Sequence, residues 1–271
     1  MSVKKIGKNG LNKSGQITLF VIIALLIVGI VLLLVFPKIK LAFVEKTPNM
    51  FVPRDCFKEA VQGVMEEVLI NGAELKPELY FRYENETIAY VCYTSEWYKT
   101  CMMQNPLLKQ SIEAEINANI QQKALKCLSD MESQLKREGY EVKSTGTKKT
   151  SIAIVPKKII ISPDINMVIQ KGEEQSSVIS DSIFKTELNS NVYDILMIAS
   201  SIQNYEARYG DASIDIYMSF YPSLKVEKKR QEDGTKIYII TERNTEEKFQ
   251  FATRSLAWPP GIEVKATGGN Q

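Results

Sequence analysis

The longest apolar run of the chain lies near its start. Residues 16–36 carry no charge, and only Gln16 and Thr18 among them are polar. At a helical rise of about 1.5 Å per residue, a run of this length matches the roughly 30 Å hydrocarbon core of a membrane. A cleavable secretory signal has a shorter apolar core, of about 7–15 residues, followed by small residues. We therefore expect residues 16–36 to be a retained transmembrane helix in the lipid bilayer; the alternative is a buried helix of a soluble domain.

Basic residues are distributed unevenly around this run. Residues 1–15 carry four lysines and no acidic residue, whereas only Lys38 and Lys40 follow the run closely. The positive-inside rule then places residues 1–15 in the cytoplasm. We expect a single-pass protein of the cell membrane, with the bulk of the chain on the extracytoplasmic side.

Two later segments show the periodicity of amphipathic helices. The first begins at Asp55 and ends near Gly72, and the second runs from Pro106 to Glu138. Because each has one apolar stripe, the two helices are expected to pack on each other. The stripes consist of Phe57, Val61, Val64 and Val68 in the first helix, and Leu108, Ile112, Ile116, Ile120, Ala124, Leu128, Met131 and Leu135 in the second.

Short alternating segments predict β-strands. A hairpin is expected from residues 79–83 and 88–93, with residues 84–87 as its turn. A helix over residues 185–209 should cover one face of the sheet that precedes it. The other expected strands are 140–144, 151–155, 158–162 and 166–171, followed by a meander of 224–229, 236–241 and 248–253. The predicted fold is α+β: one N-terminal transmembrane helix, then a domain with two or three amphipathic helices and an antiparallel sheet or meander.

Prolines and composition suggest how the chain is divided. Residues 37–54 contain three prolines and no clear periodicity, which is typical of a linker. We expect residues 55–139 to form a helix-rich, disulfide-stapled subdomain and residues 140–261 an α+β subdomain. Residues 262–271 are expected to be a flexible tail.

Charge and composition exclude several function classes. The net charge of the 271 residues is +2, and without the four N-terminal lysines it is −2, which gives no broad basic surface for nucleic acid. The chain has no histidine, so Ser-His-Asp catalysis and histidine-ligated metal sites are ruled out. Ser182 to Lys185 matches the S-x-x-K pattern of acyl enzymes, but so does Ser133 to Lys136 inside a plain helix. We expect no catalytic residue, no cofactor and no metal.

All four cysteines follow the apolar run, which suggests disulfides on the oxidising side of a membrane. Four cysteines allow three pairings. Cys56 lies in the first turn of one predicted helix and Cys127 beside the apolar stripe of the other, so packing of the helices favours a Cys56–Cys127 bond. Cys92 and Cys101 would then close a short loop. A zinc site is the alternative, but the close cysteine spacing of such sites is missing.

The loop between Cys92 and Cys101 is rich in aromatic residues. Tyr93, Trp97 and Tyr98 carry polar groups on large rings, a chemistry enriched at recognition surfaces. A disulfide-closed loop loses less entropy on binding. We therefore take these three residues as a candidate recognition loop, against the alternative that they pack on the helices. Asn85, in an N-x-T sequence at the predicted hairpin turn, is a candidate glycosylation site.

One short motif carries a resemblance to a known family. The segment KSGQITLF, Lys13 to Phe20, resembles the start of archaeal type IV pilin-like proteins, in which a peptidase cuts after the glycine. The resemblance implies cleavage after Gly15, with Gln16 as the new N-terminus. Phe20 stands where pilins usually carry a glutamate that pairs with a neighbouring subunit, so the resemblance implies membrane insertion more than filament assembly. The layout around GTKIYIITERNTEEKFQFATRSLAWPPG is also similar to archaeal membrane-anchored surface proteins of uncharacterised role.

These patterns together predict a membrane-anchored surface protein with a structural or interaction role. Its partners would be the lipid bilayer through residues 16–36 and a protein or other envelope component, with self-association as a further option. A pilin-like subunit processed after Gly15 is the first alternative. An extracytoplasmic enzyme is the second.

Overall fold

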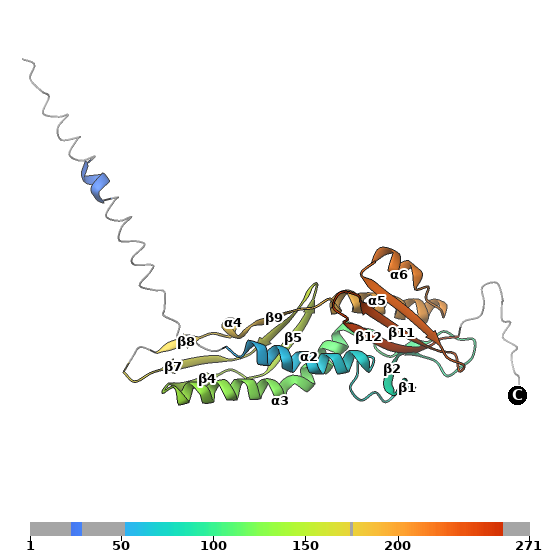
Figure 1. Ribbon diagram of the computed structural model, residues 1–271, viewed down its shortest axis with the longest axis horizontal. Helices are drawn as coiled ribbons and strands as arrows, with labels where there is room; N and C mark the ends of the chain where they lie inside the picture. Colours follow the sequence, from blue (N-terminus) through green and yellow to red (C-terminus); the bar gives the residue numbers. More distant parts are fainter. Residues whose placement is uncertain (1–22, 29–51, 174–175, 257–271) are drawn as a thin grey trace, which may run out of the picture. The chain divides into compact units, whose positions relative to one another are not determined.

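The computed structural model describes residues 23–28, 52–173 and 176–256 (Figure 1). The chain divides into two units, residues 1–50 and residues 51–271. In the first unit, residues 23–28 are helical. The rest of the predicted membrane segment, most of the linker 37–54 and the tail 262–271 lie outside the described residues. Within the described ranges, no helix combines the length and apolarity needed to cross a membrane.

The second unit is α+β, as predicted. Its two helices α2 (Arg54–Ile70) and α3 (Leu108–Arg137) pack along each other. Their buried residues include every member of the two predicted stripes. Cys56 and Cys127 are joined by a disulfide across this interface, with their Cα atoms 5.9 Å apart. Because the bond closes a loop with a sequence separation of 71 residues, chain entropy alone gives it about 4 kcal/mol of stabilisation.

Six strands within residues 141–189 lie beside α3 (Figure 1). They are β4 (Glu141–Thr145), β5 (Thr150–Val155), β6 (Lys158–Pro163), β7 (Asn166–Gln170), β8 (Ser177–Ile179) and β9 (Thr186–Asn189), with the short helix α4 (Asp181–Phe184) between the last two. β4 pairs with β7 and β7 with β8, while β5 pairs with β6 and β6 with β9. These strands therefore form two three-stranded sheets, and the chain passes from β4 into β5 and β6 of the second sheet before it returns to β7 and β8 of the first. Between them, Gly146 has a φ of 101° and approaches the Asp164 carbonyl too closely for any side chain.

A six-stranded sheet forms the other part of the core. Its strands are β1 (Tyr80–Tyr83), β2 (Glu86–Tyr93), β3 (Met102–Met103), β10 (Leu224–Arg230), β11 (Thr235–Glu242) and β12 (Lys248–Arg254). The order is β1-β2-β12-β11-β10, with β3 on β2, and β2 runs parallel to β12. Helix α5 (Val192–Tyr209) packs on β12, β11 and β2, and helix α6 (Asp215–Phe220) on β10. The last three strands form the predicted meander.

Side chains of α3 satisfy the free edge of β5. Gln121 exchanges two hydrogen bonds with the backbone of Thr150, of 3.0 and 2.7 Å. One turn earlier, Asn117 Oδ1 accepts from the Ile152 N–H at 2.7 Å. A further turn earlier, a Glu113 oxygen accepts from the Ile154 N–H at 2.7 Å, and Lys109 donates to the Ile154 carbonyl. We call Lys109, Glu113, Asn117 and Gln121 the polar ladder of α3.

Two sequence-based predictions about the third helix are wrong. Residues 186–189 form strand β9, and the helix begins only at Val192. The segment pairs with β6, so its backbone bonds are made to a neighbouring strand rather than within a helix. The helix also lies mainly on the six-stranded sheet rather than on the sheet of residues 140–171.

The predicted division at residue 139 separates strands that belong together. β2 precedes that residue and β12 follows it, yet they are neighbours in one sheet. The hairpin turn is also shorter than predicted, because β2 already begins at Glu86. Glu84 and Asn85 alone form the turn, both with positive φ, as two-residue hairpin turns require.

Removing the side chain of one residue of the polar ladder should measurably lower the free energy of unfolding. In Asn117→Ala, the Ile152 N–H loses its acceptor in a half-buried position, which costs about 1–3 kcal/mol. We expect a lower free energy of unfolding in urea and faster hydrogen exchange at the Ile152 amide.

The matched control is Asn119→Ala on the same helix. Asn119 is exposed and its side chain bonds only to the Glu115 carbonyl one turn earlier. Both substitutions gain the same helix propensity. Equal unfolding free energies for the two variants would show that the ladder does not stabilise the β5 edge.

Candidate functional site

The candidate recognition loop is fastened at both ends. The second disulfide joins Cys92 to Cys101, with Cα atoms 5.4 Å apart, and β3 pairs back onto β2. The Thr94 N–H donates to the Arg254 carbonyl at 3.0 Å, and the Leu256 N–H donates to the Lys99 carbonyl at 2.9 Å. The loop is therefore bonded to the end of β12 as well as to itself. Both disulfides have the pairing favoured by the sequence.

The buried Arg254 side chain supports the loop by contacts with Thr94 and Trp97. Its Nη1 donates to the Thr94 carbonyl at 2.5 Å, and its Nε donates to the Asp233 carbonyl at 3.0 Å. The guanidinium carbon lies 5.3 Å from the centroid of the Trp97 ring, within the range of a cation–π contact. Arg254 is only 9% exposed, so these contacts form in a largely desolvated setting. One buried side chain thus holds the loop backbone, the 231–234 turn and the indole together.

The tip of the loop displays large apolar surfaces. Trp97 is 58% exposed, Tyr98 54% and Met102, just beyond the disulfide, 76%. Tyr93 differs, because it is half-buried and its ring meets the Tyr90 ring edge-on at 4.9 Å. Burial raises the pKa of Tyr90, whose hydroxyl lies 2.7 Å from Thr235 Oγ1. Of the three predicted recognition residues, Trp97 and Tyr98 lie at the surface, and Tyr93 packs beside the sheet core.

A buried polar network lies behind the loop. The Cys101 N–H donates to Ser255 Oγ at 3.0 Å, and the Ser255 hydroxyl donates to the backbone carbonyl of Glu206 at 2.7 Å. The Glu206 carboxylate is fully buried and lies 2.6 Å from Lys236 Nζ. Tyr238 donates its hydroxyl hydrogen to the same carboxylate. These contacts connect the loop to helix α5 and strand β11.

Sequence reasoning did not identify Arg254, Ser255, Glu206 or Lys236. One signal for Glu206 was present: in α5 it continues the apolar stripe of Val192, Ile195, Ala199 and Ile202. An acidic residue at a core-facing position needs a partner inside the protein. Nothing in the local sequence of β12 marks Arg254, because its partners lie 21 and 160 residues away.

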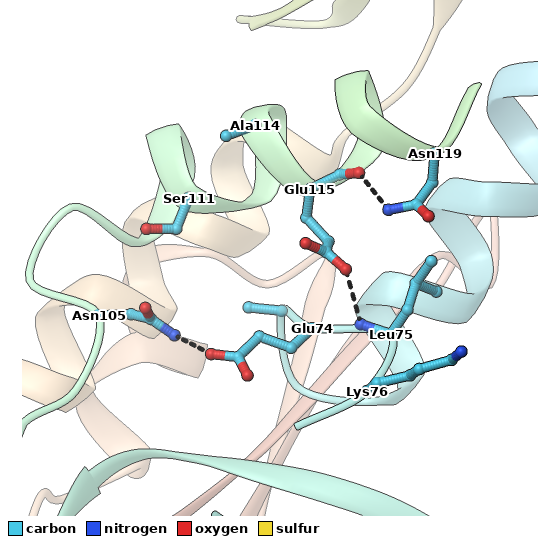
Figure 2. Close-up of a pocket in the computed structure, with 9 residues that line it drawn as sticks. Glu74, Leu75, Lys76, Asn105, Ser111, Ala114, Glu115 and Asn119 are labelled. Atoms are coloured by element: carbon cyan, nitrogen blue, oxygen red, sulfur yellow. Dashed lines mark hydrogen bonds between the residues drawn. The ribbon is translucent and has the colours of Figure 1, made fainter. Parts of the chain in front are cut away.

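A separate polar pocket lies between α3 and residues 73–76 (Figure 2). Its volume is about 540 Å³. In Figure 2, the carboxylates of Glu74 and Glu115 reach into the space between the two segments. Glu74 accepts from the Asn105 amide at 3.2 Å and Glu115 from the Leu75 N–H at 3.1 Å. One oxygen of each carboxylate therefore already accepts a hydrogen bond from the protein.

The described part of the chain offers no metal centre. Within it, no three histidine, cysteine, aspartate or glutamate side chains come together in a geometry suited to a metal ion. The two carboxylates of the pocket in Figure 2 therefore have no third carboxylate or thiol side chain grouped with them among the described residues.

The remaining candidate residues fall in different places. Ser182 lies in α4, exposed, and its hydroxyl is 2.7 Å from Ser180 Oγ. Asn85 is exposed at the tip of the β1–β2 hairpin. The predicted processing site, Gly15 and Gln16, lies outside the described residues. None of these residues is part of the loop and its supports.

The geometry combines an exposed aromatic tip with a rigid base, an arrangement that suits binding. Neither a protein-family model, nor a curated protein, nor a solved structure matches the chain. The loop, its supports and the chemistry of its exposed residues are therefore the features that bear on function.

Arg254 should be required for the order of the loop. In Arg254→Ala, the carbonyls of Thr94 and Asp233 lose charged donors, and hydrogen bonds to charged groups contribute about 1.5–3 kcal/mol each. We expect a lower free energy of unfolding and faster hydrogen exchange of the amides in residues 94–100. Arg243→Ala is the control, because Arg243 is an exposed arginine in the turn between β11 and β12, at the opposite end of these strands from Arg254. Similar exchange of the loop amides in both variants would contradict the supporting role of Arg254.

Proposed function

We propose that this protein is a single-pass, membrane-anchored surface protein that binds an envelope partner through the disulfide-closed loop 92–101. Residues 16–36 act as the anchor, and the domain that follows faces the extracytoplasmic side. The role is structural or adhesive, without catalysis. The observation that carries the proposal is the exposure of Trp97 and Tyr98 on a loop fastened by a disulfide and by Arg254.

The exposed rings explain why a binding role is favoured. Tryptophan and tyrosine are enriched among the residues that contribute most to binding, because they bury a large area with few rotatable bonds. Here the loop backbone is already fixed by bonds to β12, and Arg254 lies against the Trp97 ring. Binding would therefore cost little additional ordering.

The disulfides support an extracytoplasmic location. Stable disulfides form in oxidising compartments and are rare in the cytosol. All four cysteines are paired in the described chain, and all follow residues 16–36. The lysines before that segment favour the same orientation. Asn85, exposed on a hairpin tip on the same side, is the proposed position for a glycan.

Removing the Trp97 side chain should abolish binding of the partner. Removing a central aromatic residue of an interface costs about 2 kcal/mol or more, which is about thirtyfold in affinity. We expect Trp97→Ala to lose the envelope component that cross-links to the full-length protein on intact cells, with no change in its unfolding free energy beyond about 1 kcal/mol.

Tyr209→Ala provides the matched control. Tyr209 is an equally exposed aromatic residue, at 63%, but it belongs to α5 and not to the disulfide-closed loop. Retention of the cross-linked component by Trp97→Ala, or its loss from Tyr209→Ala alone, would contradict the proposed site.

The anchor can be tested at the N-terminus of the mature protein. If residues 16–36 are a retained anchor, N-terminal sequencing of protein extracted from membranes should find a start before Gly15. Protease added to intact cells should degrade the domain after residue 52, because it faces outward. A mature chain starting at Gln16 would instead favour the pilin-like alternative, and full protection from protease would contradict the orientation.

A further inference from the structure

The most enclosed charged pair of the described chain joins helix α5 to strand β11. Glu206 comes from α5, and its side chain is 0% exposed; Lys236 comes from β11, and its side chain is 5% exposed. Lys236 Nζ lies 2.6 Å from Glu206 Oε2. Two charges buried in this way lose most of their hydration, and the loss is large for each ion. A chemical step that removes both charges is therefore favoured at this position.

The contact between the two groups differs from an ordinary ion pair. Glu206 Oε2 has no hydrogen-bond partner, although Nζ is close to it. Nζ donates instead to the carbonyl oxygen of Gly210, the residue after α5. The amine nitrogen thus touches the carboxyl group without the alignment of a hydrogen bond to Oε2.

The other carboxyl oxygen is held by two donors. Tyr238 donates its hydroxyl hydrogen to Glu206 Oε1, and the Ala212 N–H donates to the same atom at 3.1 Å. Burial, reinforced by the nearby Glu206 charge, raises the pKa of Tyr238 far above its ordinary value, so the hydroxyl keeps its proton. Two fixed donors on one oxygen stabilise the negative charge that forms there when a nucleophile adds to the carbonyl carbon.

A third side chain can accept the proton of the amine. Asp211 Oδ1 lies 3.5 Å from Lys236 Nζ, and Asp211 also pairs with Lys228 and Arg230. Burial alone would raise the pKa of Asp211, but the hydrogen bonds and charges of these three cations lower it below its usual value. Asp211 therefore stays in the carboxylate form.

We propose that Lys236 and Glu206 form an intramolecular amide bond between Nζ and Cδ. One proton passes from the ammonium group directly to Glu206 Oε2, which lies 2.6 Å from Nζ, and this leaves a neutral amine and a carboxylic acid. The amine lone pair then attacks Cδ, and the charge that develops on Oε1 is held by Tyr238 and the Ala212 N–H. A second nitrogen proton is transferred to Oε2 across the same contact, with Asp211 as the neighbouring proton acceptor 3.5 Å from Nζ; the Cδ–Oε2 bond then breaks, and one water molecule leaves. No oxidant, reductant or further reactant is needed.

The bond would covalently join two elements, α5 and β11, that lie beneath the recognition loop and are connected to it by hydrogen bonds. The backbone carbonyl of Glu206 accepts the hydrogen bond of Ser255, which in turn accepts from the Cys101 N–H. An amide from Glu206 to Lys236 ties this end of α5 to the central region of the six-stranded sheet. The site lies apart from the exposed rings of Trp97 and Tyr98, so the proposal does not depend on what the loop binds.

The mass of the full-length protein tests the proposal directly. We expect the non-reduced chain to be lighter than its sequence by the hydrogens of the two disulfides and by one further water molecule. After reduction and complete digestion, tandem mass spectrometry should find Glu206 and Lys236 in one branched peptide. Lys157 and Asp194 form the internal control, because they are an exposed pair 2.8 Å apart and should appear in unlinked peptides.

Two variants define the roles of the groups. Lys236→Met removes the nucleophile and should restore the mass of the missing water. Asp211→Asn should slow formation of the link by at least tenfold, since a positioned proton acceptor contributes about 10²–10⁴-fold. The proposed amide is wrong if neither freshly made nor aged wild-type protein has lost the mass of one water molecule, and if Glu206 and Lys236 are found in separate peptides. Equal rates of linkage in wild type and Asp211→Asn would overturn the role of Asp211.

Discussion

The structure depends on the two stripes that helix α3 presents to different neighbours. The apolar stripe, from Leu108 to Leu135, packs against α2 and the core. The polar ladder, one turn apart at each step, bonds the edge of β5. Four residues of helix rise about 6 Å, and two residues of strand about 6.6 Å, so the two repeats stay matched over several steps. One helix therefore supports both a helix pair and a sheet edge.

The hydrogen bonds from α3 to the edge of β5 also hold the sheet that contains β5 in place. An open strand edge is a template for pairing with another chain, and here the N–H groups facing α3 are already used. The sheet of β5, β6 and β9 is thereby fixed against α3. The Cys56–Cys127 bond fixes α3 against α2. The parallel pairing of β2 with β12 then joins the early part of the chain to the last strand of the six-stranded sheet. These contacts between distant segments make residues after 51 one compact unit.

The candidate site follows from the same arrangement. Because β2 lies beside β12, the loop after β2 comes next to Arg254 at the end of β12. The buried arginine then reaches the Thr94 carbonyl and the Trp97 ring. Ser255, the next residue, bonds both Cys101 and the end of α5. An exposed pair of aromatic rings is thus carried on a base in which each backbone segment is bonded to another.

The sequence alone determined the elements whose signals are local. Apolar periodicity located α2 and α3, and alternation located most of the strands, including the three strands of the final meander. The helix stripes also favoured the cysteine pairing found in the structure. Tertiary structure decided the rest: residues 186–189 became a strand because β6 offered backbone partners, and Asn117 became structural because β5 lies beside it. Arg254 and Glu206 acquired their roles in the same way, since a buried charge is tolerable only where distant parts of the chain supply its partners.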